Sequence, residues 1–225
     1  MSPADINAVV LTLQLALTTT FVLFVIGTPV AWWLATTHRV FKPAIEAITA
    51  LPLVLPPTVL GFYLLILLSP QSSLGSFIVE ITGVRLIFSF TGLVFASVIY
   101  SLPFMVQPLQ VAFERVQPHS LEDAYMLGAR KIRALLFVIF PQCKRGFVTA
   151  AVLTFAHTVG EFGVVLMIGG NIPGETRVIS IAIYEHVETI AYADAHVLAA
   201  FLLVFSFLTL LGVFALNRHL PLRTH

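Results

Sequence analysis

The run from Val9 to Thr36 reads VVLTLQLALTTTFVLFVIGTPVAWWLAT and contains no Asp, Glu, Lys or Arg. A helix needs about 20 mostly apolar residues to cross the hydrocarbon core of a membrane, and this run is long enough. The rest of the chain has the same character, because 58% of its 225 residues are hydrophobic and only 10% are charged. Soluble domains carry about 25% charged residues. The sequence therefore predicts an integral membrane protein.

Further apolar runs predict an all-α protein with five transmembrane helices in a single membrane domain, residues 1–225. The predicted spans cover about residues 9–36, 45–68, 86–107, 147–168 and 195–217. The weaker stretch from Val178 to Ile190 carries Glu185, His186 and Glu188. We expect this stretch to form a short helix at or outside the membrane surface.

The basic residues predict the orientation of the chain. Ten of the twelve Lys and Arg residues follow spans one, three and five, and only Arg85 and Arg177 lie in the other connecting segments. Cytoplasmic loops collect Lys and Arg, so the N-terminus is expected to be periplasmic and the C-terminus cytoplasmic. The single cysteine, Cys143, is then expected to face the reducing cytoplasm.

The predicted cytoplasmic loop, about residues 114–146, holds the most polar segment of the chain. Ser120 stands three residues before Asp123, a spacing that caps the start of a helix. We therefore predict a short helix from Leu121 to about Leu127. Gly128 either ends this helix or lets another backbone approach closely. The alternative interpretation is an ordinary capped loop.

A second amphipathic helix is predicted over residues 129–140, and we expect Pro141 to end it. Its apolar residues Leu135, Leu136 and Val138 are expected to face the membrane.

The second span contains the proline-rich stretch LPLVLPPT, residues 51–58. Pro56 frees the carbonyl group of Pro52, and Pro57 frees that of Leu53. Such carbonyl groups must face protein or a watery cavity rather than lipid. The pattern predicts a broken or kinked helix beside a translocation path, with Pro56, Pro57 and Thr58 as pore or gate candidates. A simple packing kink is the alternative.

The fourth span carries Ala150, Thr154, His157 and Glu161 at spacings that share one helical face. Glu161 stands 14 residues after Phe147, which places it about 21 Å along a helix, in the outer half of the membrane. Thr154, His157 and Glu161 are therefore pore or gate candidates. Glu161 either lines the gate or is a buried anchor bonded to His157 or to backbone amides. A bare carboxylate repels anions, which favours the anchor.

The segment GGNIPGETR, residues 169–177, is typical of a turn, and it supplies Asn171, Glu175 and Arg177 as periplasmic candidates. Arg177 is a candidate to meet an oxyanion or a binding protein. A surface ion pair with Glu175 is the alternative.

The segment from Glu122 to Gly128, with Pro141 thirteen residues further on, resembles the loop by which permease subunits of ABC importers grip their ATPase. The family pattern reads Glu-Ala-Ala, three residues, Gly, nine residues, Ile-x-Leu-Pro. Asp123 replaces the second residue of this pattern, Val138 the Ile and Phe140 the Leu. The resemblance implies that the ATPase is contacted by Glu122, Asp123, Ala124, Gly128, Ala129 and Pro141.

The likeness extends over nearly the whole chain. Residues 51–58, the Gly160-Glu-Phe-Gly163 segment and residues 171–177 together look like the permease subunit of bacterial molybdate transporters. The Gly-Glu-Phe-Gly segment alone also fits the related sulfate permeases. The Pro-Pro pair and the segment from Asn171 to Arg177 favour molybdate.

The resemblance implies a multi-pass protein of the bacterial inner membrane that imports molybdate by alternating access. A homodimer then forms the pore, two ATP-binding ABC subunits dock in the cytoplasm, and a periplasmic oxyanion-binding protein delivers the substrate. The chain is then not an enzyme, because the partner ATPase binds ATP and Mg. The sequence has neither a phosphate-loop motif nor a zinc-type His/Cys cluster, so we expect no cofactor, metal or nucleic acid in this chain.

Three alternatives stay open. A sulfate, thiosulfate or tungstate ABC permease shares the coupling loop. An ion-coupled secondary transporter instead uses His157 and Glu161 as a proton relay. A membrane scaffold without transport is hard to reconcile with a broken second span and a buried Glu161.

Overall fold

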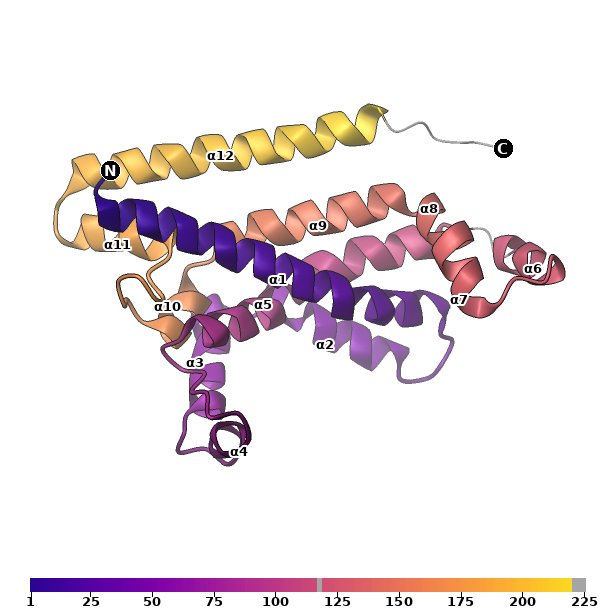
Figure 1. Ribbon diagram of the computed structural model, residues 1–225, viewed down its shortest axis with the longest axis horizontal. Coiled ribbons are helices and arrows are strands. Elements are labelled where there is room, and N and C mark those ends of the chain that lie inside the picture. Colours follow the sequence, from indigo (N-terminus) through magenta and orange to yellow (C-terminus); the bar gives the residue numbers. More distant parts are fainter. Residues whose placement is uncertain (117–118, 220–225) are drawn as a thin grey trace.

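The computed structural model describes residues 1–116 and 119–219, and most of this part is helical (Figure 1). Arg223, expected in the cytoplasm, lies outside the described residues. The helices are α1 (Pro3–Thr36), α2 (Lys42–Val54), α3 (Pro57–Leu68), α4 (Ser73–Thr82), α5 (Phe90–Glu114), α6 (His119–Met126), α7 (Lys131–Ala134), the π-helical turn η1 (Leu135–Ile139), α8 (Phe140–Gln142), α9 (Lys144–Val159), α10 (Gly163–Gly169), α11 (Ile179–Glu188) and α12 (Tyr192–His219). The all-α prediction is confirmed for the described part.

Helices α1, α5 and α9 pack side by side and form the centre of the bundle. Their contact is filled by large apolar side chains, among them Leu23 of α1 and Met105 and Leu109 of α5, all fully buried. Helix α12 packs against α9 and α11. Figure 1 shows the N-terminus and α11 at one end of the bundle, α6 and α7 at the opposite end, and α3 and α4 projecting from its side.

By length and composition, three described helices can cross a membrane: α1, α5 and α12. The number rises to five if each of two bent helix pairs is taken as one span. The long helices run past the predicted limits, since α1 already begins at Pro3 and α12 at Tyr192. Ser2 explains the early start of α1, because its hydroxyl and the Asp5 carboxylate form a reciprocal capping box.

Two predicted spans are interrupted, one where its prolines predicted a broken or kinked helix and one where no break was expected. The span predicted over residues 45–68 consists of α2 and α3, which meet at an angle of 112°. The span predicted over residues 147–168 ends at Val159 and resumes as α10 at Gly163. Between Val159 and Gly163 the chain is not helical, so Glu161 lies in a break and not on the face of a continuous helix.

The segment after α6 also differs from its prediction. Pro141 was expected to end the helix, but helical structure continues to Gln142. A proline cannot bond to the carbonyl four residues earlier, and the π-helical turn absorbs this defect, with the Phe140 N–H bonded to the Leu135 carbonyl. Leu135 and Val138 pack against the protein core rather than facing outward, whereas Leu136 stays about half exposed.

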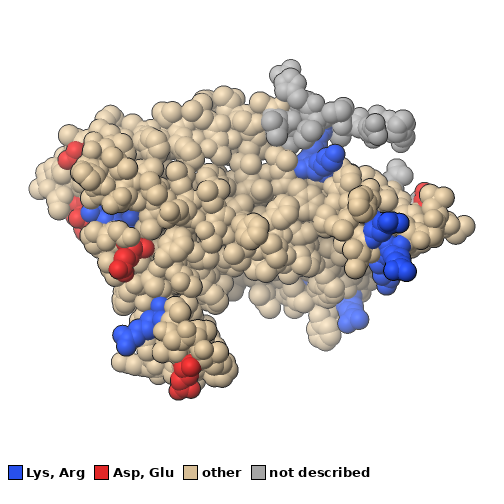
Figure 2. Space-filling model, in the orientation of Figure 1, with Lys and Arg blue, Asp and Glu red and all other residues tan. Residues whose placement is uncertain are grey.

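Basic side chains gather at the α6–α7 end of the molecule, as Figure 2 shows for one face. Arg130, Lys131 and Arg133 belong to this end. The opposite end, around α11, shows several acidic side chains on the same face. Basic side chains are therefore concentrated at the α6–α7 end, whereas the α11 end shows both acidic and basic side chains.

Candidate functional site

The first break separates α2 from α3 at Leu55 and Pro56. Pro56 and Pro57 have no N–H group, so neither can continue the hydrogen-bond ladder of α2. The Pro56 carbonyl instead starts α3 by accepting bonds from the N–H groups of Val59 and Leu60. The sequence-based prediction of a broken helix is confirmed here, and the consecutive prolines are its cause.

The second break lies between α9 and α10. Helix α9 ends at Val159 with Gly160 as its C-cap, and Phe162 has φ −130° and ψ −65°, outside the helical region. The chain then resumes as α10 at Gly163, where a Cβ atom would lie only 2.9 Å from the Pro57 Cβ. Glycine is therefore required sterically where α10 begins, because α3 occupies the space of a side chain.

The two breaks meet around one cavity. Its volume is about 470 Å³, and it is lined by Pro57, Thr58, Tyr100, Ala156, His157, Gly160, Glu161, Phe162 and Gly163. Pro57 and Thr58 come from the first break, and Gly160 to Gly163 come from the second. Transporters often place such interrupted helices around the substrate path. Four of the six pore candidates therefore line this cavity: Pro57, Thr58, His157 and Glu161. Pro56 precedes them as the N-cap of α3.

Glu161 is held by α5. Ser97 donates a hydrogen bond to Oε2 at 2.5 Å, and Ser101 donates one to Oε1 at 2.7 Å. His157, the first expected partner, lies within ion-pair distance of Glu161, with Nδ1 3.5 Å from Oε1, and the same Nδ1 shares a shorter hydrogen bond of 2.9 Å with the Ser101 hydroxyl. The Glu161 side chain is therefore buried, and its main partners are two serines of another helix, which is the arrangement expected of an anchor.

His157 is fixed by aromatic rings as well as by Ser101. Its imidazole stacks on Phe104 with a centroid distance of 3.9 Å and lies 4.8 Å from the Tyr100 ring. The side chain is 20% exposed, toward the cavity. Thr154 behaves differently, since it is fully buried and does not line the cavity.

Glu185 of α11 binds two side chains of the loop that precedes this helix. Asn171 donates to Glu185 Oε2 at 2.7 Å, and the Arg177 guanidinium lies 3.1 Å from the same oxygen. The alternative pair of Arg177 with Glu175 is wrong, because Glu185 takes that place. The Nε of Arg177 is buried without a hydrogen-bond partner among the described residues.

Helix α6 presents an apolar tip next to Gly128. Met126 and Leu127 are 90% and 88% exposed, whereas Ala124 is buried against the chain itself. Gly128 ends the helix with φ +79°, a left-handed conformation that favours glycine, and a side chain at that position would meet no atom within 4 Å. The Ala129 N–H then bonds to the Ala124 carbonyl at 2.9 Å. Within this chain, Gly128 is thus required by its backbone conformation and not by a close neighbour.

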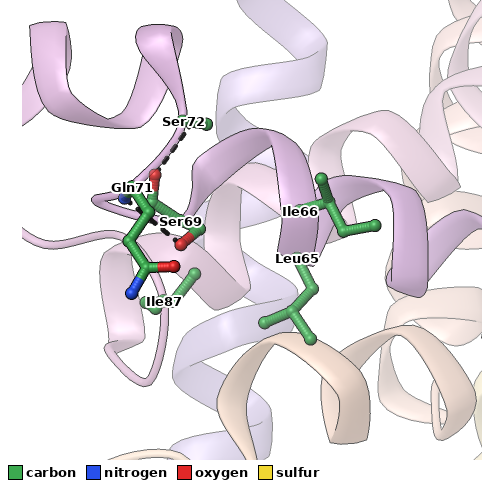
Figure 3. A pocket seen from close by; sticks show the side chains of 6 residues that line it. All are labelled: Leu65, Ile66, Ser69, Gln71, Ser72 and Ile87. Carbon is green, nitrogen blue, oxygen red and sulfur yellow. Dashed lines mark hydrogen bonds between the residues drawn. The ribbon is translucent and has the colours of Figure 1, made fainter.

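A second cavity, of about 340 Å³, lies between α3 and the segment before α5 (Figure 3). Leu65 and Ile66 form its apolar wall. The Ser72 hydroxyl donates to the Ser69 backbone carbonyl, and the Ser69 hydroxyl accepts a bond from the Gln71 N–H, so these polar groups already have partners within the turn. We assign no role to this cavity. Among the described residues, no group of three or more His, Cys, Asp or Glu side chains is placed to hold a metal ion.

Comparison with known proteins identifies the family. The profile described as "Binding-protein-dependent transport system inner membrane component" matches residues 27–224. The chain belongs to this family. It is 53% identical over 219 residues, 97% of its length, to the molybdenum transport system permease protein ModB of Azotobacter vinelandii, of which it covers 96%. It is also 34% identical over 210 residues, 93% of its length, to the sulfate transport system permease protein CysT of Synechocystis, of which it covers 73%.

Solved structures agree with this family at the level of the fold. A bacterial ABC transporter involved in the import of alginate matches 98% of this chain and 81% of its own chain, with a TM-score of 0.79 and 19% identity. An inward-facing methionine ABC transporter, MetNI, covers 98% of this chain and 100% of its own, with a TM-score of 0.69 and 19% identity. This inner membrane component therefore has the fold of an ABC transporter permease.

Several residues of the site were not predicted from the sequence. Ser97 and Ser101 stand four residues apart in an apolar span, so they form a short polar stripe on one helical face. That spacing was a usable signal, because polar groups inside a membrane helix generally face protein. Tyr100 and Phe104 gave no comparable signal, since aromatic residues are common in apolar spans.

Proposed function

We propose that this inner membrane component is the permease subunit of an ATP-driven importer of molybdate. The observation that carries the proposal is the 53% identity, over 97% of the chain, to a protein named as a molybdenum transport permease. The two breaks at one cavity support it, because interrupted helices provide the unpaired backbone groups that substrate sites in transporters use. The protein moves its substrate by alternating access and breaks no bond itself.

The proposed topology has five spans, with the N-terminus periplasmic and the C-terminus cytoplasmic. The three long helices give five spans when α2 with α3, and the segment Lys131–Gln142 with α9, are each counted as one bent span. The basic end at α6 and α7 is then cytoplasmic, as the distribution of Lys and Arg in membrane proteins favours. The opposite end, with α11 and the loop from Asn171 to Arg177, is periplasmic.

The proposed assembly contains two copies of this chain and two ATPase subunits, which bind ATP and Mg. Helix α6 and Gly128 form the contact with the ATPase, together with Glu122, Asp123, Ala129 and Pro141. The exposed Met126 and Leu127 support this assignment, because large apolar side chains at the tip of a polar loop are typical of a protein contact. A periplasmic oxyanion-binding protein docks at the α11 end.

Glu161 closes the outer part of the path without touching the substrate. Its carboxylate has no exposed surface and is bonded to two serines of α5, so an anion in the cavity has no direct access to it. Thr58 and His157 line the cavity and supply the polar groups nearest to the path.

The test is to express the chain with a tag, together with candidate ATPase and binding-protein partners from the same organism, and to purify the complex. The proposal expects an ATPase to co-purify, and reconstituted vesicles to take up molybdate only when ATP and the loaded binding protein are supplied. Uptake driven by a proton gradient, without an ATPase, would instead support an ion-coupled secondary transporter.

A sulfate permease is the second candidate. The 34% identity to a sulfate permease over 93% of the chain favours it over other anions. Thiosulfate and tungstate importers belong to the same alternative. The same vesicles separate these candidates when each anion is supplied with the chain's own binding protein.

A further inference from the structure

Helix α11 holds the second break through two side chains. The Ser180 hydroxyl donates a hydrogen bond to the Glu161 backbone carbonyl at 2.5 Å, and the Tyr184 ring packs on Phe162 with a centroid distance of 5.1 Å. Residues four apart lie on one face of a helix, so Ser180 and Tyr184 present a single surface to the break. Consecutive residues of the break, Glu161 and Phe162, are therefore both attached to α11.

Besides packing against α12, α11 has polar attachments at the end of the molecule where the chain begins. They fix α11 to α1 and to the loop that precedes α11. These contacts are Ile179 N to Thr12 Oγ1 at 2.8 Å, His186 Nε2 to Asp5 Oδ1 at 2.9 Å, and Arg177 to Glu185 at 3.1 Å. A short helix held on several sides moves as one body, so a displacement at its outer surface reaches the break.

We propose that α11 couples the docking of the binding protein to the second break, with Ser180 and Tyr184 as the positioning residues. This inference rests on the proposed function, in which a binding protein docks at the α11 end. The Ser180 bond goes to the main chain of Glu161, while the Glu161 carboxylate is bonded to α5. A movement of α11 therefore changes how the break sits against α5, and coupling between sites is carried by such connected rigid elements.

The test uses the complete complex in vesicles, with ATP hydrolysis measured with and without molybdate-loaded binding protein. For Ser180→Ala we expect stimulation by the binding protein to fall about fivefold or more, the lower range of coupling between sites. The unstimulated rate and the binding-protein concentration at half-maximal stimulation stay unchanged, because neither the ATPase contact nor the docking surface is altered. Tyr184→Ala acts in the same direction, and Ser180→Thr, which keeps the hydroxyl, retains stimulation.

Thr189→Val, at the C-cap of the same helix, is the control. It removes a hydroxyl whose hydrogen bonds, to the Glu185 and His186 carbonyls, stay within α11. It should be stimulated like the wild type. An equal loss in Thr189→Val, or a loss shared by the unstimulated rate, would overturn the inference.

Normal stimulation of both Ser180→Ala and Tyr184→Ala would also overturn the coupling role of α11. If Ser180→Ala does not assemble, Tyr184→Ala decides alone, because this side chain is 42% exposed and its removal leaves little buried space. A wild-type complex without any stimulation would overturn the proposed function itself, and the inference with it. Normal stimulation of the wild type and of both variants, in contrast, would overturn only the inference and leave the proposed function standing.

Discussion

Ser97 on α5 donates a hydrogen bond of 2.5 Å to the carboxylate of Glu161, although the two residues are 64 positions apart in the chain. Ser101, one turn further along α5, bonds to the other carboxylate oxygen. The Glu161 side chain has no exposed surface. The second break is thus fastened to α5 by a carboxylate with both oxygens occupied.

Removing the Glu161 side chain should release the break from α5. Glu161→Ala leaves the Ser97 and Ser101 hydroxyls buried without this partner, at a cost on the order of 1–3 kcal/mol for each unsatisfied group. We expect loss of both stability and transport. Glu161→Gln keeps the shape and one acceptor oxygen, and Ser101 can turn its hydroxyl toward Thr158 or His157. This variant should retain appreciable transport.

The measurement is ATP-driven uptake, normalised to the amount of assembled complex. A proton relay predicts a different result, because glutamine cannot exchange protons and would be as inactive as alanine. An inactive but fully assembled Glu161→Gln complex would therefore contradict the anchor role.

Gly163→Ala should disturb the junction of the two breaks. Its Cβ would lie 2.9 Å from Pro57 and 3.3 Å from the Thr58 nitrogen, and overpacking of this kind costs about 1–3 kcal/mol. Gly160→Ala is the control in the same break, since its nearest neighbour would be 3.6 Å away. We expect a lower melting temperature and reduced uptake only for Gly163→Ala. Equal behaviour of the two variants would show that the α3–α10 contact can give way.

Gly128→Val should abolish ATP-driven uptake while the chain stays in the membrane. Gly83→Val is the control, because Gly83 has a similar φ of +69° and, like Gly128, no atom within 4 Å of an added Cβ. The two substitutions carry similar backbone strain, about 1–2 kcal/mol. They differ in that Gly83 lies at the end of α4, away from the proposed ATPase contact. Full uptake by Gly128→Val, with the ATPase still bound, would count against the coupling role of α6.

The orientation can be tested by thiol labelling, but the native cysteine is a poor probe. Cys143 is buried, its thiol bonds to the Ala112 carbonyl, and burial raises its pKa to about 11. In a Cys143→Ala background, a membrane-impermeant reagent should label Glu175→Cys in intact cells. It should label Val40→Cys, at a position 91% exposed, only after the membrane is made permeable. The reverse pattern would contradict an N-terminus outside.

The contrast between the two breaks shows what sequence reasoning can reach. The break at Pro56 was predictable because prolines lack the N–H that a helix needs, a property of the residue itself. Nothing between Val159 and Gly163 forbids a helix locally. That break depends on the close approach of α3 to Gly163 and on the serines that hold Glu161, and both are contacts between distant segments.

The same limit applies to the partners of charged residues. The pairs of His157 with Glu161 and of Arg177 with Glu175 were proposed because the residues are near in sequence. Glu161 is bound mainly by Ser97 and Ser101, and Arg177 by Glu185. In a chain with few charges, the partner of a buried charge depends on which polar groups the packing of the helices brings next to it.

The most direct test of the central claim is the choice of anion. Vesicles containing the complete complex should take up molybdate at low concentration when ATP and the chain's own binding protein are present. A large excess of sulfate should compete poorly. The matching binding protein is necessary because it performs much of the selection. Strong sulfate uptake without molybdate uptake would contradict the assignment and favour a sulfate permease.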